Sequence, residues 1–108
     1  MAKVIDLNDN NFAETLKTGI TLVDFWAPWC GPCMMQGPVV EKVAEIVGDK
    51  ATVAKVNVDE GQRIAAQYEI RSIPTLIVFQ DGTPVQQFVG MQSESQLVAA
   101  IEEAAKGS

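Results

Sequence analysis

The segment Ile20–Trp26 constrains the fold more than any other part of the chain. Its apolar side chains fall on both faces of an extended strand, and Asp24 is the one charged residue among them. A strand of this kind is typical of the interior of a sheet that is buried on both faces. The sequence therefore predicts a sheet with helices packed against both of its faces.

Helical and strand-like spacings alternate along the rest of the chain. Strands are expected at residues 4–5, 52–58, 75–79 and 85–89, and helices ahead of Gly19, at residues 33–47, at residues 62–68 and after Ser93. Asp81-Gly82 supplies a tight turn between the last two strands. This order, β-α-β-α-β-α-β-β-α, predicts an α/β fold in which four helices flank a central mixed five-stranded sheet. We expect one domain over residues 1–108, because a chain of this length buries a sufficient core.

The same patterns predict helix ends and buried helix faces. Asn8 or Asp9 is expected to cap the first helix, and Ser93 with Gln96 a capping box for the last one. Pro38 is expected to bend the long helix. The expected buried stripes consist of Met35, Val39, Val40, Val43, Ala44, Ile46 and Val47 in the long helix, and of Leu97, Ile101, Ala104 and Ala105 in the last.

Charge and composition exclude several classes of function. Eight basic and fourteen acidic residues give a net charge of -6, which repels nucleic-acid phosphates and anionic lipid headgroups. No apolar run approaches the roughly 20 residues that span a bilayer, and no signal-peptide stretch follows Met1-Ala2-Lys3. We therefore expect a cytoplasmic monomer without nucleic-acid or membrane partners. The absence of histidine from the sequence excludes imidazole acid–base catalysis and most zinc sites.

Two cysteines, Cys30 and Cys33, follow the buried strand and begin the long helix. The free N–H groups and the positive dipole end of a helix N-terminus favour a thiolate, which makes Cys30 the better nucleophile. Cys33 lies about one turn further along and can attack a mixed disulfide formed on Cys30. Pro32 suits an early helical position, and Gly31 lets a substrate backbone approach. The pattern predicts dithiol–disulfide exchange.

Two other interpretations of the cysteine pair are weaker. A static disulfide is rare in the cytosol, and closing so short a loop removes little chain entropy. Half of a zinc site would need further ligands, and the sequence has neither a histidine nor a second Cys-x-x-Cys. The sequence therefore favours redox chemistry and predicts no bound metal.

The residues around the pair belong to a specific combination of motifs. It comprises Asp24-Phe25-Trp26-Ala27-Pro28-Trp29-Cys30-Gly31-Pro32-Cys33, then Lys55, Asp59 and Ile73-Pro74-Thr75. With these motifs the chain resembles the thioredoxin family over nearly its whole length. The resemblance implies the thioredoxin fold and a protein-disulfide reductase that serves cell redox homeostasis and electron donation. It also implies a redox-active Cys30–Cys33 disulfide with no bound cofactor, protein disulfides as substrates, and recycling by a thioredoxin reductase. We expect this reductase to be an NADPH-dependent flavoprotein, with ferredoxin as the alternative source of electrons.

Asp24 is a candidate proton acceptor. It is a carboxylate in an apolar strand, so desolvation should raise its pKa, and Lys55 on the next expected strand is a candidate partner. The resemblance implies that Asp24, through water, helps to deprotonate Cys33. The alternative is a structural ion pair, because buried pairs also perturb pKa values.

The resemblance further implies a docking surface beside the cysteines. A cis peptide bond before Pro74 is implied, next to backbone that hydrogen-bonds an extended substrate, whereas an ordinary strand-edge turn is the alternative. The implied substrate-binding residues are Trp29, Gly31, Pro32, Ile73, Pro74 and Gly90. Trp26 and Pro38 are expected to support the site, although either tryptophan could be an ordinary core residue.

Two residues near the site depart from the family pattern without touching its core chemistry. Met34 stands where many relatives carry lysine or arginine, so a cation that would favour the Cys30 thiolate is missing, and Ser72 stands where bacterial relatives carry glycine. One alternative is a dithiol oxidase or isomerase, which needs a destabilised disulfide and usually an oxidising compartment. Another is a binding subunit that uses the surface around Trp29 and Pro74, with the thiols incidental to affinity.

Overall fold

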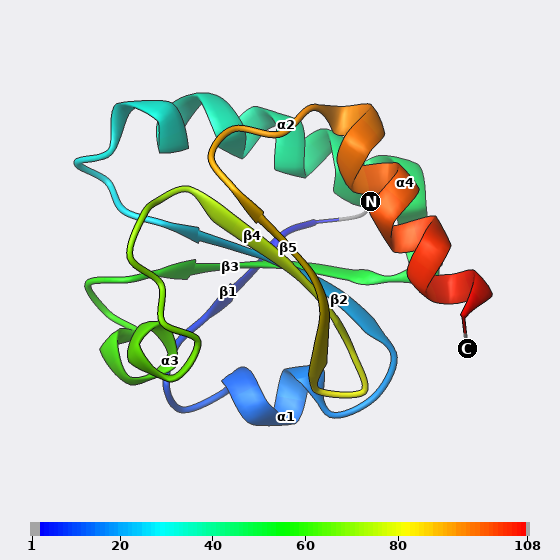
Figure 1. The fold of residues 1–108 in the computed structure, drawn as a ribbon, viewed down its shortest axis with the longest axis horizontal. Coiled ribbons are helices and arrows are strands. Elements are labelled where there is room, and N and C mark those ends of the chain that lie inside the picture. Colours follow the sequence, from blue (N-terminus) through cyan, green and yellow to red (C-terminus); the bar gives the residue numbers. More distant parts are fainter. Residues whose placement is uncertain (1–2, 108) are drawn as a thin grey trace.

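Between residues 3 and 107, the part of the chain that the structure describes, five strands and four α-helices form the fold (Figure 1). The structure is a computed structural model, and the outermost residues of the expected 1–108 domain lie outside the described part. The strands are β1 (Ile5–Leu7), β2 (Ile20–Trp26), β3 (Thr52–Asn57), β4 (Thr75–Gln80) and β5 (Thr83–Val89). The helices are α1 (Phe12–Leu16), α2 (Gly31–Val47), α3 (Gln62–Gln67) and α4 (Glu94–Lys106), with a short 3-10 helix, η1 (Gly48–Lys50), after α2. The expected order of elements is confirmed.

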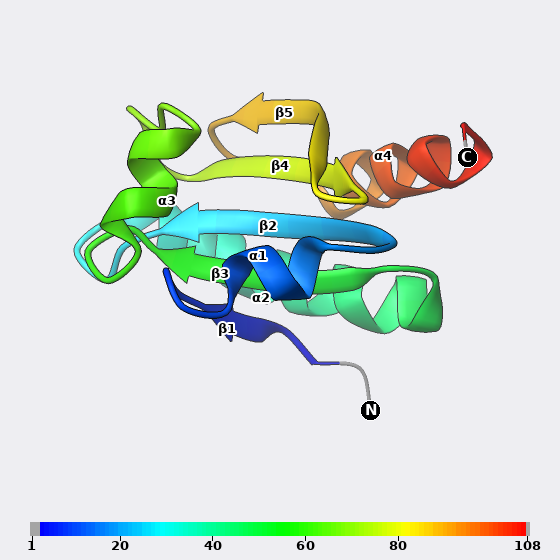
Figure 2. The same ribbon diagram turned by 90° about the horizontal axis from the view of Figure 1, so that it is seen from below.

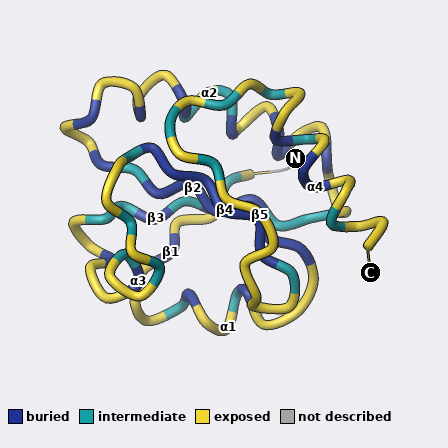
Figure 3. The backbone as a smooth tube through the Cα atoms, viewed as in Figure 1, coloured by how far each residue is buried: buried dark blue, intermediate teal, exposed yellow. Residues whose placement is uncertain are grey.

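β2 occupies the centre of the sheet, whose strand order is β1-β3-β2-β4-β5. β3 runs parallel to β1 and β2, whereas β4 runs antiparallel to β2 and β5. Residues 20–25 of β2 are all buried, and Figure 3 shows β2 and β4 as the dark interior of the molecule. The mixed sheet with an interior apolar strand is therefore confirmed.

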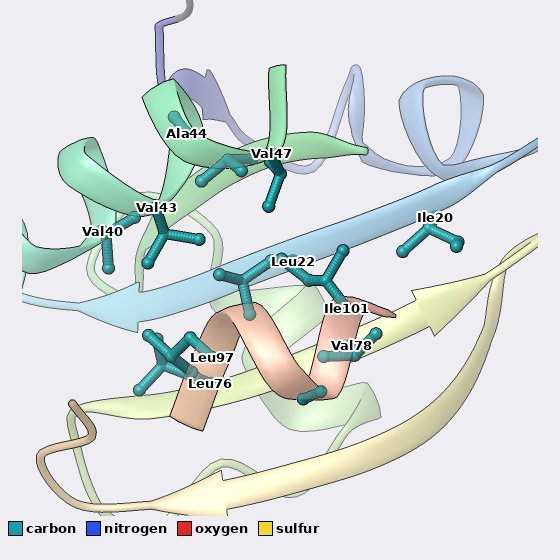
Figure 4. Close-up of a cluster of buried hydrophobic side chains, with 12 residues drawn as sticks. Ile20, Leu22, Val40, Val43, Ala44, Val47, Leu76, Val78, Leu97 and Ile101 are labelled. Carbon is teal, nitrogen blue, oxygen red and sulfur yellow. The ribbon is translucent and has the colours of Figure 1, made fainter. Parts of the chain in front are cut away.

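Helices cover the sheet on both faces. α2 and α4 lie on one face, and α1 and α3 lie on the other (Figures 1 and 2). Leu22 of β2 packs with α2 and α4, whereas the neighbouring Val23 packs with α1 and α3. Figure 4 shows the first of these clusters, where Val43 of α2 and Leu97 of α4 surround Leu22. Because successive side chains of a strand point to opposite faces, the continuous apolar run of β2 supplies both layers of the core.

α2 buries a different face from the one that its apolar residues predict. Met35 is 69% and Ile46 is 49% exposed, so their expected burial is wrong. The buried residues of α2 are Cys33, Gln36, Val40, Val43, Ala44 and Val47. These positions recur every three or four residues and form one stripe against the sheet, which includes the polar Gln36. Pro38 lies inside α2, and the bend that it should cause stays a prediction.

The first helix begins later than expected. α1 starts at Phe12 with Asn11 as its N-cap residue, so the expected cap at Asn8 or Asp9 is wrong. The Asp9 carboxylate instead accepts a hydrogen bond, at 3.2 Å, from the N–H of Ile64 in the first turn of α3. A side chain from one segment thus satisfies a free N–H group at the start of a helix distant in sequence.

The last helix begins as its sequence predicts. The capping box between Ser93 and Gln96 is present in full at the start of α4. The buried face of α4 includes the expected Leu97 and Ile101, but Ala100 is buried in place of Ala105, which is exposed. The expected helix is confirmed with a slightly rotated inner face.

A pair of valine substitutions on adjacent strands tests this packing. Val78 in β4 is 0% exposed and lies in the cluster of Figure 4, while Val85 in β5 is 49% exposed. We expect Val78→Ala to lower the free energy of unfolding by about 2 kcal/mol, because it removes buried methyl groups and leaves a cavity. Val85→Ala should lower it by less than about 0.5 kcal/mol. Denaturant unfolding of the two oxidised variants measures the difference, and equal losses would contradict the packing.

Candidate active site

The two cysteines lie where β2 passes into α2. They form a disulfide, and their Cα atoms are 5.3 Å apart. Cys30 is the N-cap residue of α2, and its Sγ accepts a hydrogen bond from the N–H of Cys33 at 3.3 Å. In the reduced protein this N–H and the positive end of the helix dipole stabilise a thiolate on Cys30. Gly31 and Pro32, which form the first turn, are exposed.

The loop before β4 lies against the cysteines, at the same edge of the sheet as the start of α2 (Figure 1). Sγ of Cys30 is 3.7 Å from the carbonyl oxygen of Ile73, and the Ile73–Pro74 peptide bond is cis, as the family resemblance implies. The carbonyl oxygen of Pro74 accepts a hydrogen bond from the N–H of Gly90 at 2.8 Å. Ile73 and Gly90 are partly exposed, but Pro74 is buried, so the Pro74 ring adds little to the exposed surface.

The two tryptophans have different surroundings, as expected. Trp29 is 69% exposed, and its Nε1 donates a hydrogen bond to the Asp59 carboxylate at 2.9 Å. Trp26 is partly buried and packs against the cysteines, and Nζ of Lys55 lies 5.2 Å from the centre of its ring. Trp29 is therefore an oriented surface residue, whereas Trp26 lies beneath the site.

Sequence reasoning found adaptable apolar contacts near the cysteines at Met34 and Met35 but missed Met91. Met34, Met35 and Met91 all have exposed side chains. Met34 and Met35 follow Cys33 in α2, and Met91 follows Gly90 after β5. The position of Met91 beside an expected docking residue is the signal that could have found it.

Asp24 is 2% exposed. Burial raises the pKa of its carboxyl group from 3.8 to about 7, against the opposing effect of the positive charge on Lys55. Its Oδ1 is buried and makes no hydrogen bond to the residues that the structure describes. Asp24, Cys33 and Lys55 line one pocket of about 270 Å³. The carboxyl group and the second cysteine thus border the same pocket.

Lys55 acts on Asp24 at longer range than expected. The two residues are paired in register on β2 and β3, but Nζ of Lys55 forms an ion pair with the Asp6 carboxylate on β1, at 3.8 Å. Within residues 3–107 no direct ion pair joins Lys55 to Asp24. Lys55, the candidate partner of Asp24, therefore forms its ion pair with Asp6 and acts on Asp24 electrostatically, across the pocket that both residues line.

Two kinds of feature are absent from the described residues. In residues 3–107 no group of three or more His, Cys, Asp or Glu side chains could hold a metal ion. None of the helices in that same range has the length and apolar character needed to cross a membrane.

Exchange between the reduced Cys30 and Cys33 thiols and the disulfide of another molecule is the chemistry that this geometry serves, and the protein is a dithiol–disulfide oxidoreductase. Comparison with known proteins gives the family. Residues 3–103 match the family model described as Thioredoxin. The thioredoxin of Staphylococcus saprophyticus is 48% identical over 99 residues, which are 92% of this chain and 95% of the relative. That of Staphylococcus aureus is 46% identical over the same shares of the two chains.

Solved structures agree with the sequence comparison. A mutant thioredoxin from Halobacterium salinarum has a TM-score of 0.86 at 40% identity and covers 94% of this chain and 89% of its own. The thioredoxin Mala s 13 of Malassezia sympodialis has a TM-score of 0.84 at 38% identity and covers 95% and 91%. The chain belongs to the thioredoxin family. Chemistry in this family is carried by the redox-active cysteine pair without a bound cofactor, and the partners are disulfide substrates and a reductase.

The substitution Asp24→Asn tests the burial of the carboxyl group. An unfolded Asp24 ionises around pH 3.8, whereas the folded one keeps its proton up to about pH 7. Between these values the unfolded state binds fewer protons than the folded state, so stability falls as the pH rises and stays low above about pH 7. We expect Asp24→Asn to remove this slope and to gain roughly 2–4 kcal/mol of stability at about pH 8 relative to its effect at about pH 4.

Denaturant unfolding of the oxidised protein across this pH range measures the effect. Glu102→Gln, which changes an exposed carboxylate on α4, is the matched control and should keep the slope. An unchanged slope in Asp24→Asn would show that the carboxyl group is not the source of the pH dependence.

Proposed function

We propose that the chain reduces protein disulfides, with Cys30 as the nucleophile and Cys33 as the resolving cysteine. The observation that carries this assignment is the position of Cys30 at the N-cap of α2, where its sulfur accepts a hydrogen bond from the N–H of Cys33. A thiolate is stabilised at this position, and the thiolate is the attacking species in disulfide exchange.

The reaction takes two exchange steps. The Cys30 thiolate attacks one sulfur of the substrate disulfide, so that a mixed disulfide forms and the other substrate sulfur leaves as a thiolate. Cys33 then loses its proton and attacks the Cys30 sulfur, which forms the Cys30–Cys33 disulfide and releases the second substrate thiolate. Two electrons pass to the substrate, and both released thiolates take up protons.

Asp24 accepts the proton of Cys33 in this proposal. A carboxyl group with a pKa of about 7 gains and loses a proton near neutral pH, unlike one with the ordinary value of 3.8. The positive charge of Lys55 limits how far burial raises that pKa. Trp26 and Pro38 line the pocket between Asp24 and Cys33 and support its shape.

The proposed docking surface surrounds the cysteine pair. It consists of Trp29, Gly31, Pro32, Ile73, Pro74 and Gly90. Its support is the oriented, exposed Trp29 and the carbonyl of Ile73 beside Cys30. An extended substrate segment can hydrogen-bond the backbone there, in the manner of strand addition. The exposed methionines extend this surface with adaptable apolar contacts.

The proposal also covers the setting in which the protein works. Electrons come from an NADPH-dependent flavoprotein reductase, and the protein acts as a cytoplasmic monomer with one domain over residues 1–108. Membership of the thioredoxin family supports the reductase, and the family match over residues 3–103 supports a single domain.

The substitution Cys33→Ser separates the roles of the two cysteines. We expect this variant to accumulate a stable mixed disulfide with a small protein that carries one exposed disulfide, because the first step proceeds and the second lacks its thiolate. Cys30→Ser is the matched control and should trap at least roughly tenfold less, since its remaining thiol lacks the helix N-cap position. Intact-mass measurement counts the adducts, and equal trapping by both variants would contradict the assigned roles.

The reduction potential of the Cys30–Cys33 pair tests the direction of the reaction. We expect a value below that of the cytosolic glutathione pool, about -220 mV or lower, because a general reductant must hold its disulfide more stably than its substrates do. Titration against a thiol buffer, followed by the fluorescence of the neighbouring tryptophans, gives the value. A potential close to that of a strong oxidant, about -120 mV, would instead indicate an oxidase.

A further inference from the structure

Gln36 is a fully buried polar side chain that takes no part in the disulfide exchange described above. It is 0% exposed on the inner stripe of α2, three residues after Cys33. A buried amide is costly unless its donors and acceptors are satisfied. Oε1 of Gln36 accepts a hydrogen bond from the N–H of Gln92 at 2.8 Å, and Nε2 of Gln36 donates one to the carbonyl oxygen of Gln92 at 3.1 Å. One side chain therefore binds the backbone of one residue at both of its polar groups.

The segment that Gln36 holds is residues 90–92, called here loop 90–92. Figure 1 shows the chain between β5 and α4, in orange, passing beside α2. At its start, the N–H of Gly90 donates to the carbonyl of Pro74. Nε2 of Gln92 donates to the carbonyl of Gly90 at 3.3 Å, and the α4 capping box begins at Ser93. Loop 90–92 is thus tied to the segment before β4 at one end and to the cysteine-bearing helix at the other.

Loop 90–92 belongs to no helix or strand. Gly90 has a φ of 92°, in the left-handed region that L side chains rarely adopt, and Met91 is exposed. Gly90 is part of the proposed docking surface, and Met91 extends it. No strand partner binds the backbone at Gln92, and the two bonds from Gln36 satisfy both its N–H and its carbonyl group.

We propose that Gln36 is a positioning residue for protein-disulfide binding, which holds loop 90–92 against α2 so that the Gly90 side of the docking surface is preformed for an extended substrate. This rests on the docking surface of the proposed function. A preformed surface binds more tightly because less ordering remains to be done on binding. Gln36 acts through loop 90–92 and does not touch the reacting sulfurs.

The substitution Gln36→Met tests the proposal in the full-length protein. Methionine has similar length and volume but cannot replace the two hydrogen bonds, so loop 90–92 loses its attachment to α2. We expect KM for a small protein with one exposed disulfide to rise about tenfold with kcat unchanged. The rate with cystine, which has no extended polypeptide segment to lie along loop 90–92, should stay the same. Equal changes for both substrates, or no change for either, would overturn the proposal.

Amide hydrogen exchange gives a second readout. The Gln92 N–H should exchange roughly tenfold faster in Gln36→Met, while amides of β2 should stay protected. Continued protection of the Gln92 N–H would overturn the proposal. If Gln36→Met fails to fold, Gln36→Asn replaces it, because a side chain that is one methylene shorter cannot make both bonds.

Three control variants separate the alternatives. Val43→Ala lowers stability on the same buried stripe without touching loop 90–92 and should leave KM unchanged, as should Gln67→Met, the same chemical change on the exposed end of α3. Met91→Glu places a charge on the docking surface. If KM does not respond to Met91→Glu, the docking surface fails and the proposal with it. If KM responds to Met91→Glu but not to Gln36→Met, the surface stands and the role of Gln36 is overturned.

Discussion

The burial of β2 on both faces is the constraint from which the site follows. Because helices pack against the sheet from both sides, Asp24 lies in an environment where ionisation is costly, and its pKa rises to about 7. The same strand ends at the edge of the sheet, where the chain leaves the interior and Cys30 begins α2. This strand therefore positions the proposed proton acceptor and leads, through a short loop, to the proposed nucleophile. The stability lost by burying a carboxyl group is offset by the apolar residues around it in β2.

The parts of the fold that the sequence predicts are those whose signal is local. The apolar run of β2, the helix after the cysteines and the capping box at Ser93 each lie within a short segment, and each is confirmed. The incorrect predictions concern contacts that only the folded chain brings together. The Asp9 carboxylate meets the N–H of Ile64, 55 residues away, and Met35 is exposed because the sheet lies against the neighbouring stripe of α2. Apolar character alone does not say which of two adjacent stripes faces the core.

In the candidate site, too, local features can be predicted from the sequence and contacts between distant segments cannot. Cysteines at a helix N-terminus and a carboxylate in a buried strand are visible in the sequence as residue types at defined spacings. The ion-pair partner of Lys55 cannot be identified from the sequence. Strand register places Lys55 between two carboxylates, those of Asp6 and Asp24. Burial disfavours a charged carboxylate at Asp24, so the exposed carboxylate of Asp6 is the ion-pair partner that costs less desolvation.

Gln36 concerns the shape of the proposed docking surface, whereas Asp24 concerns proton transfer. On the inner stripe of α2, Cys33 serves the chemistry, Gln36 holds loop 90–92 and Val40 packs in the core, so one helix fixes all three. An apolar residue at position 36 could fill the same space, but it would leave both polar groups of Gln92 without their buried partner. The main effect of a buried polar group of this kind is to favour one arrangement of its neighbours, and its contribution to stability is smaller. In this protein that arrangement joins the proposed docking loop to the helix that begins beside Cys30 and contains Cys33.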